Sequence, residues 1–148
     1  MKRLPIFFFA LSIAALGHAQ NRSLTICPAG PEYKAGATKM TCQPTGYQCY
    51  VYPDTLLTQR DLVATRPANH KDMNVLLLEF KPEAKKIIYD ATTRYLGQYL
   101  AVLFDGKLIS VLRINVPLNR EVLLIDGKFT GESVVEAHLD LEKLIGNR

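Results

Sequence analysis

The chain has 148 residues, of which 48% are hydrophobic and 22% are charged. This composition is typical of one globular domain and excludes extended disorder, a collagen-like repeat and a coiled coil. The formal net charge of +4 at pH 7 shrinks without Lys2 and Arg3, which lie in a segment that we expect to be removed. A balance this close to neutral does not indicate a protein that binds nucleic acid.

The N-terminus has the layout of a secretory signal peptide. A basic start, Met1 to Arg3, precedes an apolar run over residues 4–16, and small residues then flank a cleavage site at Ala19. A helix needs about 20 apolar residues to span a membrane, so the length of the run argues against an uncleaved anchor. We predict a periplasmic or secreted product without a cofactor or a membrane span, beginning at Gln20.

Three cysteines follow the predicted cleavage site: Cys27, Cys42 and Cys49. In an oxidising compartment this count favours one disulfide and one remaining thiol, and three pairings are possible. The turn-forming residues 43–46 favour the pair Cys42–Cys49. A zinc site is excluded because the nearest histidine, His70, lies too far along the chain for ligand spacing.

The expected elements divide the exported chain into two parts. Residues 20–72 form a turn-rich N-terminal extension with short strands at 24–27 and 47–52 and a helical turn that begins at Thr58. Residues 73–148 form the core. Its apolar runs predict strands at 75–80, 99–104, 107–114 and 121–125, with one helix from Pro82 to a C-terminal cap at Gly97 and another after Thr130.

Two Asp-Gly pairs punctuate the core. Asp105-Gly106 lies between two apolar runs, which is the strongest short signal of a β-hairpin because both positions favour a positive φ. Asp126-Gly127 is expected to end the strand that begins at Glu121. The element order β-α-β-β-β-α predicts an α+β fold, a mainly antiparallel sheet with two helices packed on one face.

The search for chemistry predicts no catalytic, cofactor-binding or metal-ligating residue, and therefore no enzyme. His138 lies among apolar helix positions without a sequence neighbour that would support acid–base work. Neither Ser110 nor Ser133 has a nucleophile-elbow motif around it. The two Asp-Gly pairs lack the further ligands of a calcium loop and are explained by turns.

The aromatic cluster of Tyr47, Tyr50 and Tyr52 has two interpretations. On an exposed sheet face, these tyrosines would offer contact area with a polar end to an extended peptide. Alternatively they pack beneath the loop at 53–72, which the sequence favours because buried tyrosines are common where the hydroxyl reaches a partner.

Four segments, in order and spacing, resemble the head of the first periplasmic domain of SecD, a subunit of the protein-export machinery. The most telling is residues 97–110 (GQYLAVLFDGKLIS), which is similar to the family's hairpin. Residues 75–80 (VLLLEF), 125–130 (IDGKFT) and 52–62 (YPDTLLTQRDL) carry the rest. Departures occur at Tyr95, Val111-Leu112 and residues 118–120.

The resemblance implies a ferredoxin-like head fold without catalytic residues. The membrane segments with which SecD uses the proton gradient are missing from this sequence, so only the fold and a peptide-contacting role are expected to carry over. The partner is expected to be a protein: an exported unfolded chain, a translocon component or one envelope protein. A second hypothesis is an immunity, inhibitor-type or structural envelope protein on the same scaffold, since one fold hosts many functions.

Overall fold

The computed structural model describes residues 23–43 and 45–146. The predicted signal peptide and its cleavage site at Ala19 lie outside these residues. Within the described ranges, the structure has no helix with the length and apolarity to cross a membrane.

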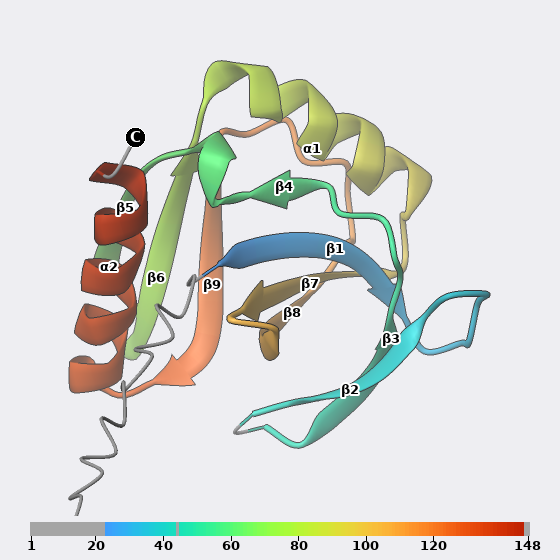
Figure 1. Ribbon diagram of the computed structural model, residues 1–148, viewed down its shortest axis with the longest axis horizontal. Coiled ribbons are helices and arrows are strands. Elements are labelled where there is room, and N and C mark those ends of the chain that lie inside the picture. The colour runs from blue at the N-terminus through green and yellow to red at the C-terminus, as the bar shows by residue number, and fades with distance from the viewer. Residues whose placement is uncertain (1–22, 44, 147–148) are drawn as a thin grey trace, which may run out of the picture.

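The strands form two antiparallel sheets (Figure 1). The larger sheet has the order β2-β3-β1-β7-β8, and β4 pairs with β1 beside this path. Its strands are β1 (Leu24–Gly30), β2 (Thr38–Cys42), β3 (Tyr47–Val51), β4 (Leu57–Thr58), β7 (Tyr99–Phe104) and β8 (Lys107–Arg113). The smaller sheet has the order β5-β6-β9, built from β5 (Leu62–His70), β6 (Met73–Phe80) and β9 (Val122–Phe129).

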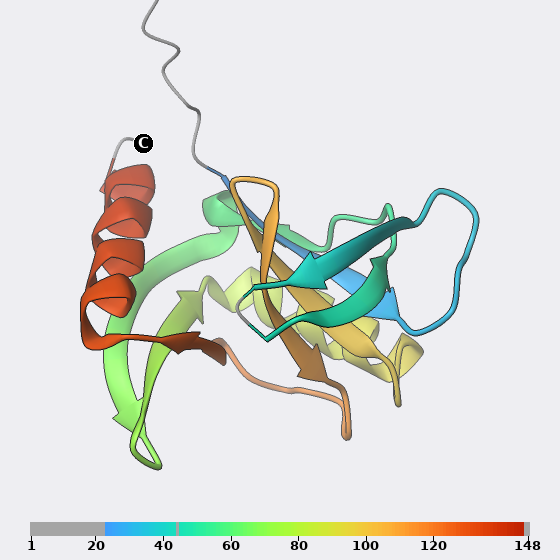
Figure 2. The same ribbon diagram turned by 90° about the horizontal axis from the view of Figure 1, so that it is seen from below.

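Two α-helices and one short 3-10 helix complete the fold: α1 (Pro82–Arg94), α2 (Gly131–Gly146) and η1 (Gln59–Asp61). From β6 onward the order is β-α-β-β-β-α, so the predicted order and the α+β class are confirmed. The strands are divided between two sheets, however, whereas the sequence suggested one. Figure 2 shows α2 standing outside the curved β5–β6 pair, apart from the larger sheet.

Strands from the turn-rich segment 20–72 share both sheets with strands that follow it. β1 lies between β3 and β7, and its pairing with β7 runs from Leu24 opposite Phe104 to Ala29 opposite Tyr99. β5 pairs with β6 along its length, with His70 opposite Met73. The boundary that the sequence suggested at residue 72 therefore falls in the turn of a β-hairpin, and both segments contribute strands to both sheets.

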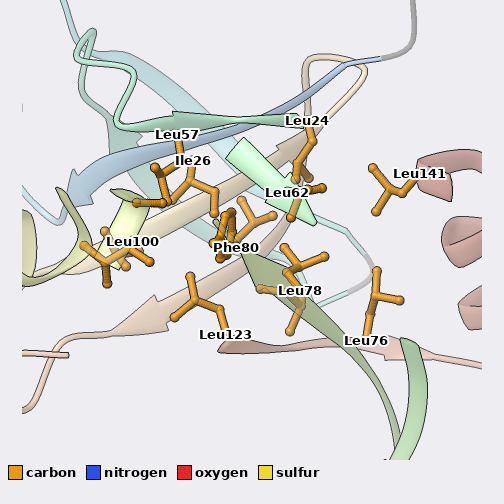
Figure 3. Close-up of a cluster of buried hydrophobic side chains, with 14 of the residues drawn as sticks. Leu24, Ile26, Leu57, Leu62, Leu76, Leu78, Phe80, Leu100, Leu123 and Leu141 are labelled. Carbon is orange, nitrogen blue, oxygen red and sulfur yellow. The ribbon is translucent and has the colours of Figure 1, made fainter. Parts of the chain in front are cut away.

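The main hydrophobic cluster fills the space between the two sheets and the helices. Phe80 lies near its centre, surrounded by leucines from both sheets (Figure 3). Both helices contribute buried side chains to this same cluster, α1 through Ala84 and Ile88 and α2 through Val134 and Leu141. The apolar stripes that predicted the two helices are therefore both buried in one core.

A second cluster covers the opposite face of the larger sheet. Successive residues of a strand point to opposite faces, so Ile26 and Val102 join the main cluster while Cys27 and Ala101 join the second. No α-helix covers this second face in the described part of the chain. Instead the sheet curls, and the end of β2 reaches β8, where the Gln43 amide donates to the Leu108 carbonyl at 3.3 Å. The second face is thus covered by the sheet's own edge.

The structure contains the turn and the helix starts that the local sequence predicted, but the first helix ends earlier than expected. Asp105 and Gly106 form the tight turn between β7 and β8, with φ of 50° and 75°. Thr58 is the N-cap of η1 and forms a capping box with Asp61. The first turn of α2 is capped by Thr130, whose hydroxyl accepts from the Ser133 amide at 3.1 Å. α1 ends at Arg94, before Gly97, with Tyr95 as its C-terminal cap.

Asp126-Gly127 does not end a strand, contrary to the prediction. β9 continues to Phe129, and residues 126–128 bulge out of the ladder between the pairs Leu76–Ile125 and Asn74–Phe129. Glycine is favoured at position 127 because an added Cβ would lie 2.9 Å from the Phe129 ring and 3.1 Å from the Ile109 carbonyl oxygen. A pair of residues suited to a turn is equally suited to a bulge.

Polar contacts attach α2 to β5, an edge strand of the smaller sheet. Thr65 is only 2% exposed, and both its amide and its hydroxyl donate to Glu142 Oε1, at 2.8 and 3.0 Å. The same hydroxyl lies 2.8 Å from Nδ1 of His138. This network satisfies a backbone donor that the strand edge would otherwise leave buried without a partner.

Replacing Thr65 by Val keeps the branched shape but removes the hydroxyl that Glu142 and His138 share. We expect Thr65→Val to lower the free energy of unfolding by about 1–2 kcal/mol, because partly buried polar groups each lose a partner. Urea denaturation followed by circular dichroism measures this change. Thr93→Val is the matched control, since its exposed hydroxyl donates only to the Tyr89 carbonyl of its own helix. A loss no greater than that of the control would contradict the assigned role.

All three cysteines are buried and carry free thiols, so the disulfide predicted from the sequence is not formed in this structure. Cys42 pairs with Tyr47 in the β2–β3 ladder, which places Cys49 diagonally across from Cys42 on the same face. Cys27 is in β1, where Ala29 pairs with Val51, so Cys27 is displaced along the sheet from Cys49. Burial raises the pKa of the Cys27 and Cys49 thiols, which leaves both in the less reactive protonated form.

Oxidation of the chain is expected to join Cys42 to Cys49 and to leave Cys27 as a thiol. Diagonal Cβ atoms lie up to about 7–8 Å apart, so the hairpin must shift to close the bond. After oxidation and denaturation, intact-mass measurement should show one maleimide label on the chain and none on Cys27→Ser. Cys42→Ser serves as the control and should take up two. Labelling of the oxidised Cys27→Ser variant at both remaining cysteines would refute this pairing.

Candidate functional site

A cleft of about 290 Å³ opens beside the second hydrophobic cluster, where the β2–β3 hairpin, the larger sheet and β9 approach one another. We call it the tyrosine cleft. It draws side chains from five strands and one turn: Cys42, Thr45, Tyr47, Tyr99, Val111, Arg113, Asp126 and Lys128. The cleft lies where the curled sheet incompletely covers its own second face.

Two tyrosines form the aromatic wall of the cleft. The rings of Tyr47 and Tyr99 meet edge to face, with centroids 5.8 Å apart and an interplanar angle of 63°. A hydrogen bond with Tyr99, together with partial burial, raises the pKa of Tyr47 to about 12, although the Arg113 guanidinium opposes this rise. The Tyr47 hydroxyl is therefore a neutral hydrogen-bonding group near neutral pH.

The rim of the cleft carries charged groups from β8 and β9. Arg113 is at the end of β8, while Asp126 and Lys128 belong to the bulge in β9. Within the bulge, the Lys128 amide donates to Asp126 Oδ1 at 3.1 Å, and Lys128 has a φ of 50°. The Ser110 hydroxyl donates to the Asp126 carbonyl at 3.1 Å, linking the bulge to β8. These contacts hold the charged rim in place.

The three tyrosines that are close in sequence do not share one surface. Tyr47 is 41% exposed in the cleft, whereas alternation along β3 turns Tyr50 to the other face, where its ring meets Tyr33 at 5.8 Å. Tyr52 is 4% exposed and packs beside Tyr95. Of the cluster found in the sequence, only Tyr47 lines the cleft.

Tyr52 and Tyr95 form a separate aromatic cluster with Lys34. The Lys34 ammonium lies 4.4 Å from the Tyr52 ring centroid and 5.7 Å from that of Tyr95. Burial is the larger cause that raises the pKa of the Tyr52 hydroxyl, and the nearby Glu32 charge is the second. The same hydroxyl donates a hydrogen bond to the Glu32 carbonyl at 3.3 Å. These contacts tie the loop after β1 to the end of α1.

Sequence reasoning missed Tyr99, Arg113 and Lys128 as residues of a common site. Tyr99 and Arg113 stand opposite each other in the β7–β8 ladder, so a correct hairpin register does place them together. No local signal, however, brings Tyr47 next to Tyr99, because that contact depends on β1 lying between β3 and β7. Lys128 was missed because the bulge was interpreted as a strand end.

The groups considered for catalysis have structural partners. The Thr65 hydroxyl, which lies between His138 and Glu142, is buried and already hydrogen-bonded to both. The Ser110 hydroxyl donates to the backbone of the β9 bulge, and Ser133 belongs to the cap of α2. Across residues 23–43 and 45–146, no three His, Cys, Asp or Glu side chains gather as metal ligands.

Two curated proteins, both named protein translocase subunit SecD, are similar to part of this chain. The one from Thermobaculum terrenum is 36% identical over 75 residues, which cover 49% of this chain and 15% of that protein. The one from Acidaminococcus fermentans is 32% identical over 66 residues, covering 44% and 16%. The chain thus spans about one sixth of the length of the curated relatives it matches.

Solved structures of SecDF share the fold. One, described as a membrane component SecDF that enhances protein export, has a TM-score of 0.64 at 20% identity and covers 81% of this chain and 61% of that chain. SecDF in its super-membrane-facing form gives 0.65 at 21% identity, over 81% and 18%. At these identities the likeness shows the fold alone.

The family model of the SecDF P1 head subdomain matches residues 36–142. This range begins before β2 and ends in α2, so it leaves out β1 but contains every residue that lines the tyrosine cleft. The chain therefore belongs to the SecDF P1 head subdomain family.

Proposed function

We propose that this chain is a non-catalytic binding module of the cell envelope, which holds extended segments of exported polypeptides in the tyrosine cleft. Membership of the SecDF P1 head family supports a role in protein export, and relatives are named as protein translocase subunits. The signal-peptide-like N-terminus supports a periplasmic location.

The tyrosine cleft is the observation that carries this proposal. Tyr47 and Tyr99 present aromatic faces beside the aliphatic Val111, and their hydroxyls offer hydrogen bonds to a passing backbone. Tyrosine gives a large contact area at a small cost in conformational entropy, which suits binding to many sequences. A volume of about 290 Å³ is at the lower end of ligand pockets and suits a short extended segment.

Binding without catalysis is supported by the structural hydrogen bonds that already engage the polar side chains considered for catalysis. A general acid or base must reach the proton that it transfers. Thr65 is 2% exposed and fastens α2 to β5, and His138 is held against its hydroxyl. The charged groups that line the cleft are one carboxylate and two cations, and no three His, Cys, Asp or Glu side chains of the described residues gather there as metal ligands.

Removing either cleft ring should weaken binding to unfolded polypeptide. We expect Tyr47→Ala and Tyr99→Ala each to raise the dissociation constant by about three- to tenfold, as truncation of a well-placed aromatic contact does. Fluorescence anisotropy with a labelled, reduced and carbamidomethylated test protein measures this change. Tyr33→Ala is the matched control, because Tyr33 is 66% exposed and contacts Tyr50 away from the cleft.

The pH dependence provides an internal check. Because the pKa of Tyr47 is raised to about 12, its hydroxyl stays protonated through the neutral range, and its contribution to binding should be constant there.

The proposal fails if the unfolded protein does not bind, or if Tyr33→Ala weakens binding as much as Tyr47→Ala. Tight binding to one folded envelope protein in place of unfolded chains would favour the inhibitor-type alternative.

A further inference from the structure

We propose that the tyrosine cleft selects polypeptide segments that carry a carboxylate, which Arg113 and Lys128 bind from the rim. This inference rests on the proposed function, because it assumes that an extended segment enters the cleft. It adds a chemical preference, for acidic over neutral segments, that neither the family nor the aromatic wall implies.

The charges at the rim are unequal. Arg113 and Lys128 are cationic and exposed, and Asp126 is the single carboxylate among the lining residues. Within the part of the chain that the structure describes, neither cation has a carboxylate within ion-pair distance; the ion pairs there involve other residues. One oxygen of Asp126 accepts the Lys128 amide. The rim therefore carries two cations and one carboxylate, an excess of one positive charge, and one oxygen of that carboxylate is engaged with the backbone of the bulge.

The cations adjoin the hydrogen-bonding wall. Arg113 lines the same cleft as Tyr47 and stands opposite Tyr99 in the β7–β8 ladder; its charge also opposes the rise in the pKa of Tyr47. A guanidinium presents several N–H groups in one plane and matches the two oxygens of a carboxylate. Tyr47 and Tyr99 have one hydroxyl proton each, and the hydrogen bond between them uses only one. Arg113 and the remaining tyrosine proton thus supply complementary donors for one carboxylate.

Lys128 is fixed at the rim by its backbone. A lysine with φ of 50° occupies the left-handed region, which is unfavourable for a residue other than glycine and persists only where surrounding contacts impose it. Here those contacts are the hydrogen bond from the Lys128 amide to Asp126 and the tight approach of Gly127 to Ile109. The ammonium group is therefore presented from a restrained bulge on β9, across the cleft from the hairpin that carries Tyr47.

Peptides with blocked termini test the preference on the unaltered chain. Two peptides differ only in a central Glu or Gln, and a third is neutral but has a free C-terminal carboxylate. At low salt the Glu peptide should bind about three- to fivefold more tightly than the Gln peptide, the upper range for exposed ion pairs. The third peptide shows whether a terminal carboxylate serves as well as a side chain. At about 0.5 M salt the preference should disappear, because the charges are screened.

Variants locate the preference. Arg113→Gln and Lys128→Gln should each reduce the ratio between the affinities for the Glu and Gln peptides. Arg94→Gln removes the same charge from α1, which packs on the opposite face of the larger sheet, and should leave the ratio intact. Circular dichroism confirms that each variant is folded, and the peptide comparison on the unaltered chain needs no variant.

The possible results separate this inference from the proposed function. If the Glu and Gln peptides bind equally and Tyr47→Ala weakens both, the carboxylate preference is refuted and the cleft still binds polypeptide. A preference that survives Arg113→Gln and Lys128→Gln together also refutes it, because the carboxylate is then recognised elsewhere. If no peptide binds at all, both the inference and the proposed function are refuted.

Discussion

The larger sheet is apolar on both faces, and the rest of the structure follows from how each face is covered. In β1 and β7, successive buried residues alternate between the two hydrophobic clusters. A sheet with two apolar faces is usually sandwiched between layers. In the described chain, the helices and the smaller sheet cover only one face. The other is enclosed by the sheet's own curl, completed where Gln43 reaches Leu108.

Incomplete closure explains why the cleft lies where it does. The side chains on the second face are small or medium in size, including Ala29, Ala101 and the three cysteines, and they permit the hairpin to fold close to the sheet. Where the hairpin ends, the larger rings of Tyr47 and Tyr99 stand at the border. A border tyrosine keeps its ring against apolar neighbours while its hydroxyl faces water. The same geometry that finishes the core therefore leaves an aromatic surface that a polypeptide can contact.

The sequence was sufficient for elements whose signals are local. The run at 99–104, the Asp105-Gly106 turn and the Thr130 cap each depend on residues within one turn or hairpin, and each is found in the structure. The position of β1 was beyond reach, because its pairing of Leu24 with Phe104 joins residues far apart in the chain. The cleft could not be predicted for the same reason, because its hairpin residues lie near β8 and β9 only when β1 is paired in the sheet.

The bulge at residues 126–128 shows how one local sequence joins structure to a candidate site. Asp-Gly favours a positive φ at two neighbouring positions, but here the left-handed residue is Lys128 and the glycine admits the Ile109 carbonyl. Because Ser110 also binds this backbone, the bulge joins β9 of the smaller sheet to β8 of the larger one. A regular strand at residues 126–128 would lack both this link to β8 and the lysine that the bulge displaces from the ladder. The contact that connects the two sheets is thus also the contact that brings a cation to the rim of the cleft.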